Sequence, residues 1–247
     1  MKRRIPILML VVGFFLTASA FGQDNDFLTD YSMLQDFSED TRFTARLYQA
    51  PNAEQRLGDY NSIMIDQPEI FIAADSKYKG AKGDQLKALA DVARLSTMAR
   101  LEANGFNVVD TPGTDTLYMR WAISDLYLQK KKRGILSYTP IGMVVHTTKS
   151  AATRDLWKKI DIAELRLEIE LTDVVTGEVI VAGISHKQGF RKQKGEKADV
   201  VTWQELEALF DTAGERLSCG ILNARKPAEE AVDCTSIWIE PEVPEKQ

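Results

Sequence analysis

Cysteine and histidine are scarce in this chain of 247 residues, which limits the chemistry that it can perform. The two histidines, His146 and His186, are separated by forty residues. Zinc sites need clustered ligands, and a histidine-dependent triad needs a nucleophile and an orienting acid beside the histidine. The sequence also lacks a P-loop, a dinucleotide-binding glycine fingerprint and a nucleophile elbow. We therefore assign no catalytic residue, no metal site and no cofactor.

Apolar runs long enough to span a bilayer are also missing, because the run at residues 5–16 falls short of the roughly 20 residues that a spanning helix needs. The run follows the basic start Met1-Lys2-Arg3-Arg4 and precedes Ala18-Ser19-Ala20, which is the order of a secretory signal peptide. We expect residues 1–20 to be removed, with cleavage after Gly22 as the second site and a short membrane anchor as the alternative. No cysteine lies near either site, so we expect an exported protein, periplasmic or associated with the outer membrane, without a lipid anchor.

The only two cysteines, Cys219 and Cys234, lie fifteen residues apart. In an oxidising compartment an even pair at this spacing predicts one disulfide. Closing a loop of this size contributes roughly 3 kcal/mol to stability in the chain-entropy description. Two buried free thiols are the alternative.

Positive charge is concentrated in one stretch of an acidic protein. The formal net charge is −5, and removal of the three basic residues of the leader changes it to −8. Residues 130–159 nevertheless hold eight basic residues and one acidic residue, around an apolar centre. Basic residues that flank apolar ones are typical of segments that contact an anionic membrane surface or a partner protein. The residues that we expect to make this contact are Lys130, Lys131, Lys132, Arg133, Ile135, Leu136, Tyr138, Trp157, Lys158 and Lys159.

The alternative for residues 130–159 is an insertion folded over the sheet. Its apolar residues would then seal the core and its lysines would lie in water.

Hydrophobic periodicity predicts an α/β fold of the α+β type, with a mixed, largely antiparallel sheet and two main helices on one face. The strand at 163–172 alternates strictly, which indicates one buried face and one wet face. On the wet face, Glu164, Arg166, Glu168 and Glu170 are interpreted as an exposed charge ladder. Strands are also expected at 62–66, 70–72, 106–110, 116–128 with a bulge near Asp125, and 178–184, and helices at 84–104 and from residue 202.

A single domain is expected to hold these elements at residues 61–235, with the basic–apolar insertion at 130–159. Before it, residues 21–60 are polar and poorly periodic, and we expect an extended segment there. Within that segment the apolar–aromatic island 27–34 can latch onto the domain. After the domain, the proline- and charge-containing residues 236–247 are expected to be disordered.

Three passages of the sequence resemble a known family. They are Phe27-Leu28-Thr29-Asp30-Tyr31-Ser32, Tyr60 with the strand Ile63-Met64-Ile65-Asp66, and Asp173–Gly177 leading into Glu178-Val179. Together with the helix and strands between them, they resemble the bacterial envelope family called domain of unknown function 3313 (DUF3313). Many members of that family look like lipoproteins, whereas this sequence has no lipobox cysteine after its leader. The resemblance implies an envelope protein and brings no catalytic residue with it.

The element order is also similar to the small α/β domains at the N-terminus of TolB and in the curli-secretion lipoprotein. This second likeness is one of topology, which does not settle function.

These observations favour a non-catalytic interaction or assembly protein of the cell envelope over an enzyme. Export and the acidic charge argue against a nucleic-acid partner. Two alternatives stay open: an exported hydrolase that uses a pair of carboxylates, and a carrier of a small apolar ligand in a cavity walled by Ile141, Val144 and the strand at 163–171. The hydrolase predicts that Glu164 and Glu168 line a cleft, whereas a binding protein predicts that they face open solvent.

Overall fold

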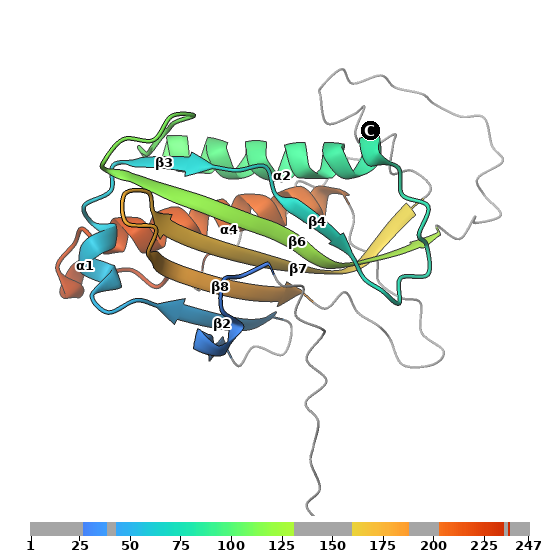
Figure 1. The fold of residues 1–247 in the computed structure, drawn as a ribbon, viewed down its shortest axis with the longest axis horizontal. Helices are drawn as coiled ribbons and strands as arrows, with labels where there is room; N and C mark the ends of the chain where they lie inside the picture. The colour runs from blue at the N-terminus through green and yellow to red at the C-terminus, as the bar shows by residue number, and fades with distance from the viewer. Residues whose placement is uncertain (1–26, 39–42, 131–159, 188–202, 235–236, 238–247) are drawn as a thin grey trace, which may run out of the picture.

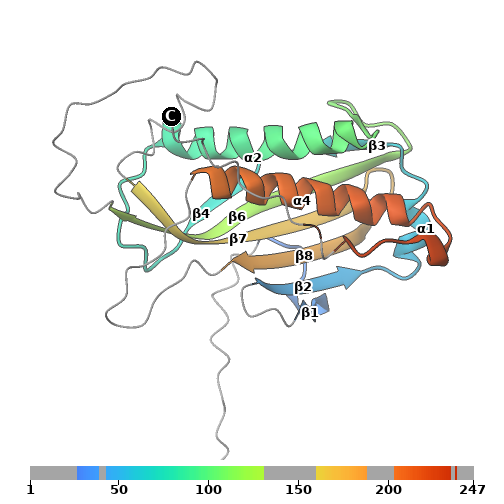
Figure 2. The same cartoon turned by 180° about the vertical axis from the view of Figure 1, so that it is seen from behind.

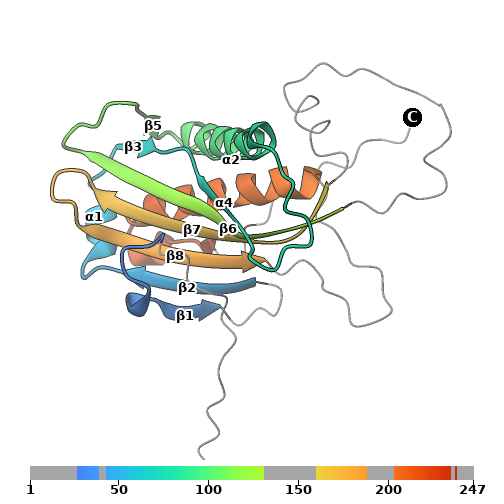
Figure 3. The same cartoon turned by 45° about the vertical axis from the view of Figure 1, so that its right-hand side comes forward.

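The computed structural model describes residues 27–38, 43–130, 160–187, 203–234 and 237, and these form a β-sheet covered on one face by helices. Figure 1 shows the sheet with the N-terminal segment in front of it. Figure 2, from behind, shows α2 (Gly83–Ala103) and α4 (Trp203–Asn223) lying across the opposite face. Figure 3 shows the helices and the sheet as two separate layers. The predicted fold class is therefore confirmed.

Eight strands of the described residues make one sheet, in the order β1-β2-β8-β7-β6-β3-β5, with β4 paired to the second half of β6. The pairs β1–β2, β2–β8, β8–β7 and β7–β6 are antiparallel, and the pairs that involve β3 or β4 are parallel. The strands are β1 (Gln35–Ser38), β2 (Phe43–Gln49), β3 (Ser62–Ile65), β4 (Glu69–Ile72), β5 (Asn107–Val108), β6 (Thr116–Lys130), β7 (Ile160–Asp173) and β8 (Val179–Lys187).

The long strands β6 and β7 form the centre of the sheet. Their register shifts between Ser124 and Tyr127, where Asp125 adopts φ 47°, a left-handed conformation that aspartate tolerates better than most side chains. The shift is the β-bulge that the sequence predicts near Asp125. The inward side chains of β6 alternate as expected, so Leu117, Met119, Trp121 and Ile123 are all buried.

The core lies between the sheet and the two helices. Phe210 of α4 is fully buried and meets Trp121 of β6 edge to face, with ring centroids 6.5 Å apart. Gly214 lies where α4 approaches α2, and a Cβ there would lie 3.0 Å from the Cβ of Arg100 and 3.2 Å from the Cα of Thr97. Only a glycine lets the two helices approach this closely without a shift.

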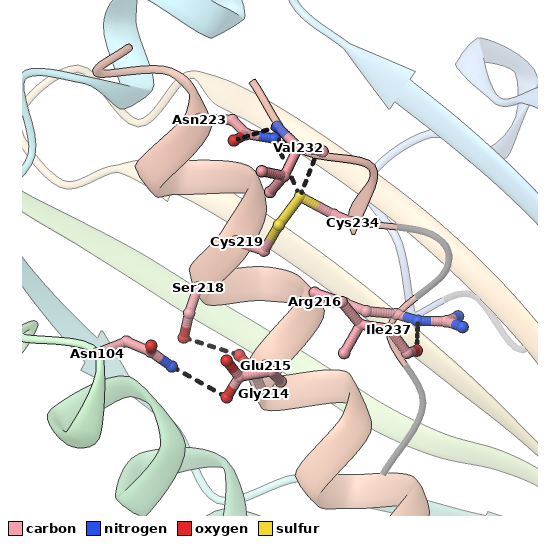
Figure 4. The surroundings of a disulfide bond; sticks show 10 residues. All are labelled: Asn104, Gly214, Glu215, Arg216, Ser218, Cys219, Asn223, Val232, Cys234 and Ile237. Carbon is pink, nitrogen blue, oxygen red and sulfur yellow. Dashed lines mark hydrogen bonds between the residues drawn. A yellow bond between two sulfur atoms is a disulfide. The ribbon is translucent and has the colours of Figure 1, made fainter. Parts of the chain in front are cut away.

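The predicted disulfide is present and joins Cys219 of α4 to Cys234 (Figure 4). The chain between them is also held by Asn223, whose side-chain amide donates to the carbonyl of Val232 at 2.7 Å and whose side-chain oxygen accepts the amide of Val232 at 3.1 Å. Arg216 extends the contact by donating from Nε to the carbonyl of Ile237. Val232, Cys234 and Ile237 are thereby held along α4.

The N-terminal part of the chain differs from the expectation of an extended segment at residues 21–60. Residues 35–38 and 43–49 form β1 and β2, which extend the sheet beyond β8, and residues 53–57 form the short helix α1. The physical reason is that β2 pairs with β8 along seven residues, so its backbone is satisfied by a strand distant in sequence.

Several sequence-based expectations fall on residues outside the described ranges. These are the leader at 1–20, the insertion at 131–159 and nearly all of the tail at 236–247. None of the helices in the described part of the chain is long and apolar enough to cross a membrane.

One end of the sheet is fastened by Tyr60 and Asp173. The buried Tyr60 donates its hydroxyl to Asp173 Oδ2 at 2.5 Å, while Asp173 Oδ1 accepts the backbone amides of Val175 and Thr176 at 2.8 and 2.7 Å. Arg225 donates to the Tyr60 carbonyl. The hydrogen bond from Tyr60, followed by those from the turn, lowers the pKa of Asp173 to about 2.

We predict that Tyr60→Phe makes the protein less stable in a pH-dependent way. Asp173 has a pKa below its ordinary 3.8 in the folded state, so its stabilisation is present above 3.8 and is lost as the pH falls toward 2. Denaturant unfolding should show a loss of about 1.5 kcal/mol at pH 7 that shrinks below pH 3.8. Tyr78→Phe is the control: its hydroxyl donates to the backbone carbonyl of Gly80, so its effect on stability should not change with pH. A Tyr60→Phe effect that does not change with pH either would contradict the assignment.

Candidate functional site

The residues that the sequence singles out for partner contact begin at the end of β6. Lys130 is exposed there, and its backbone pairs with Ile160 at the start of β7. The other residues predicted for the contact, from Lys131 to Lys159, lie outside the described residues. The structure thus shows where the basic–apolar segment departs from the sheet and returns to it, at the end of the molecule opposite α1 (Figure 1).

A second candidate site lies on the sheet face opposite the helices. Residues 27–34, which we call the N-terminal latch, cross this face and include the short 3-10 helix η1 (Tyr31–Met33). Asp30 caps η1 by accepting the amide and the hydroxyl of Ser32 at 2.8 and 2.7 Å. The turn gives the latch its own local structure.

Glu168 of β7 is the first anchor of the latch. Its side chain is fully buried and accepts the Tyr31 hydroxyl at 2.6 Å and the Ser124 hydroxyl of β6. Burial, followed by the hydrogen bond to Glu168, raises the pKa of Tyr31 to about 12, so the phenol remains a donor at every physiological pH. The same phenol oxygen accepts the backbone amides of Phe27 and Leu28 at 3.1 and 3.3 Å.

Glu170 is the second anchor, two residues further along the same face. It accepts the amide of Thr29 at 2.9 Å and the Thr29 hydroxyl at 3.0 Å. Arg120 of β6 lies 3.2 Å from the same carboxylate, donates to the Phe27 carbonyl at 3.2 Å and stacks over the Phe27 ring, 4.9 Å from its centroid. A buried carboxylate thus receives charged and neutral donors together, which offsets its loss of water.

Arg166 and Asp125 continue the polar layer. Arg166 is buried, and its guanidinium lies 2.8 Å from the carboxylate of Asp125 and 3.9 Å from that of Glu168. The bulge explains this pairing, because it places Asp125 off the regular alternation of β6. Arg46 of β2 donates to the Tyr31 carbonyl at 3.2 Å.

Apolar side chains fill the space between these polar contacts. They form a small cluster that is separate from the main core. Its buried members are Phe27, Leu28 and Leu34 of the latch and Ala122, Ala182 and Ile184 of the sheet.

The sequence interpretation of an exposed charge ladder on β7 is therefore wrong for three of its four members. Arg166, Glu168 and Glu170 are 5%, 0% and 3% exposed, and only Glu164 keeps partial exposure. The physical reason is that the latch, whose Tyr31 and Thr29 lie 137 and 141 positions earlier in the chain, covers Glu168 and Glu170. Arg166 is buried in ion pairs with Asp125 and Glu168. The signal in the sequence is the hydroxyl-rich apolar island 27–34, which predicts a latch but does not identify these acids as its partners.

Neither expectation for Glu168, a cleft for catalysis or open solvent for binding, is met among the described residues. Glu168 faces the latch rather than a cleft or open solvent. A hollow of about 400 Å³ lies instead at the β1–β2 edge, and it contains one carboxylate, that of Asp36. Its lining is Met33, Gln35, Asp36, Leu47, Tyr48 and Gln49. No pair of carboxylates converges on this hollow, and no group of metal-binding side chains occurs among the described residues.

We predict that Tyr31 and Glu168 stabilise the protein as a coupled pair. Tyr31→Phe should lower the unfolding free energy by roughly 1.5–3 kcal/mol, because it removes a donor from a buried carboxylate. In a Glu168→Gln background the same change should cost less than about half as much, and denaturant unfolding of the four proteins gives the coupling. Tyr118→Phe, which removes an exposed hydroxyl bonded to Asp66, should cost little. Additive effects of the two changes would contradict the pairing.

Comparisons with known proteins place the chain by family. No curated protein matches it. Among solved structures it is similar to the PelC dodecamer from Paraburkholderia phytofirmans, at 11% identity and TM-score 0.37, over 72% of this chain and 96% of that chain. It is also similar to a DUF4136 family protein from Bacteroides thetaiotaomicron, at 13% identity and TM-score 0.36, over 74% and 98% of the two chains. Likenesses of this degree say nothing about function.

The family comparison covers most of the chain. Residues 23–217 match the family described as "Protein of unknown function (DUF3313)". This range contains all three passages on which the resemblance was based. The chain belongs to the DUF3313 family.

Proposed function

We propose that this protein is a non-catalytic interaction protein of the cell envelope that contacts an anionic membrane surface through residues 130–159. The observation that carries the proposal is the pairing of Lys130 with Ile160, the two residues that border the basic–apolar segment. The segment therefore leaves from and returns to adjacent strand ends, as one elaborated connection between β6 and β7. A connection of this kind can contact a surface without disturbing the sheet that carries it.

Charge supports a fixed orientation toward such a surface. With the leader removed, the net charge of −8 is the balance of +7 in residues 130–159 and −15 in the rest of the chain. An anionic surface attracts the first and repels the second, so the molecule would approach it with the β6–β7 end forward. Tyr138 and Trp157 supply side chains of the type that prefers the lipid–water boundary.

Export belongs to the same proposal. The leader at residues 1–20 would deliver the chain across the inner membrane, to the periplasm or the outer-membrane surface. The disulfide between Cys219 and Cys234 supports this compartment, because such bonds persist where the surroundings are oxidising. An envelope protein in place of the lipid would use the same segment, and the experiment below separates the two.

We predict that the mature protein floats with liposomes that contain anionic lipid and not with neutral ones. The Lys130/Lys131/Lys132/Arg133 quadruple alanine variant should bind on the order of several hundred-fold more weakly at low salt, since each basic residue near the surface contributes about 1 kcal/mol. Raising the salt concentration should weaken the wild type toward the variant.

Two double variants control for net charge. Lys131/Lys132→Ala and Arg56/Lys226→Ala each remove two positive charges. Arg56 belongs to α1, and Lys226 follows the end of α4 that contacts α1. Helix α1 lies at the end of the molecule opposite the β6–β7 ends (Figure 1). The first should bind about 30-fold more weakly and the second almost normally. Equal recovery of the wild type and the quadruple variant contradicts membrane contact. Crosslinking in the native envelope, lost in the quadruple variant, would then identify a protein partner.

A further inference from the structure

The N-terminal latch does not contribute to the main core. The core between the sheet and the helices is built from buried residues from Ala50 onward. The latch residues Phe27, Leu28 and Leu34 belong instead to the small cluster on the opposite face. The body of the protein therefore has a complete apolar core of its own.

The face beneath the latch is suited to contact with water. We call this surface the recognition face, and it consists of Arg120, Ala122, Glu168, Glu170 and Ala182. Three of these side chains are charged and two are alanines, whereas the main core consists mainly of larger apolar side chains. Charged groups lose hydration when they are covered and regain it when they are exposed. Uncovering this face thus costs far less than opening the core.

The contacts across this face involve both the backbone and the side chains of the latch, as in a bound peptide. Glu170 binds the Thr29 amide and hydroxyl, and Glu168 binds the Tyr31 hydroxyl. The backbone carbonyls of the latch are bound too, that of Phe27 by Arg120 and that of Tyr31 by Arg46. The small side chains Ala122 and Ala182 leave room for Phe27 and Leu28. The ligand pattern is two apolar residues, threonine, any residue and tyrosine.

We propose that the recognition face is a peptide-binding site, that the latch is its resident ligand, and that the latch of a second copy of this chain can take its place. The second copy is the occupant because it presents the one peptide whose complementarity to this face is visible in the structure. Within one molecule the tethered latch has the advantage of a high local concentration, so exchange requires that the resident latch be released. This site is independent of residues 130–159 and of the function proposed for them.

Two full-length variants with complementary defects test the proposal. The first, Thr29→Ala/Tyr31→Ala, loses the latch hydroxyls that bind Glu170 and Glu168 and keeps the face intact. The second, Ala182→Trp, keeps an intact latch and fills the place that receives its apolar residues. Mixed at about 0.1 mM, a concentration chosen because small interfaces bind weakly, the two should form a 1:1 complex in sedimentation. Neither should do so alone.

The control is a chain that carries all three substitutions, which should associate with neither variant nor with itself. Both test variants should keep their circular dichroism and cooperative unfolding, because the core is complete without the latch. Absence of a complex between two folded variants overturns the proposal. Loss of the folded state in either variant overturns it as well, since the latch would then be part of the core.

Discussion

Two carboxylates on a covered sheet face, Glu168 and Glu170, set the main constraint on this structure. A carboxylate removed from water is costly unless donors replace the water, and removing one partner of such a group is far worse than never burying it. Here the donors come from β6 and from the N-terminal latch together. The position of residues 27–34 depends on these bonds.

Strand β7 connects the passages that mark the family. The first passage, 27–32, bonds to Glu168 and Glu170 in the middle of β7. The second, with Tyr60, bonds to Asp173 at its end, and the third is the turn that Asp173 itself caps. Passages far apart in sequence are thus fixed to one strand, two of them through carboxylates that accept tyrosine hydroxyls. The family match over residues 23–217 spans all of these contacts.

Much of the fold follows from local periodicity. The helix predicted at 84–104 is observed at Gly83–Ala103, and the phase slip near Asp125 is a bulge. Both signals are local, because each arises from neighbouring residues on one face of one element. The disulfide could be predicted for a different reason, since only one pairing of two cysteines exists.

The covered face of β7 could not be predicted in this way. Alternating charged residues indicate a polar face, but periodicity does not distinguish a face in water from one covered by hydroxyls and amides more than a hundred residues away. The sequence does not identify strand β2, because the alternation of apolar Ala45 and Leu47 with the charged Arg46 is short. Its place in the sheet depends on β8, which follows it by more than 130 residues. The interaction surface at 130–159 is predicted from composition alone, and the structure adds where its two ends lie.

Amide hydrogen exchange at Thr29 tests the central claim most directly, because that amide donates to the carboxylate of Glu170. If the latch is held by the buried acids, the Thr29 amide exchanges much more slowly than in an unstructured chain, and Glu170→Gln speeds it without changing exchange in the centre of β7. Exchange at the unstructured rate in the wild-type protein would show that the latch is not docked on β7 and would contradict the account.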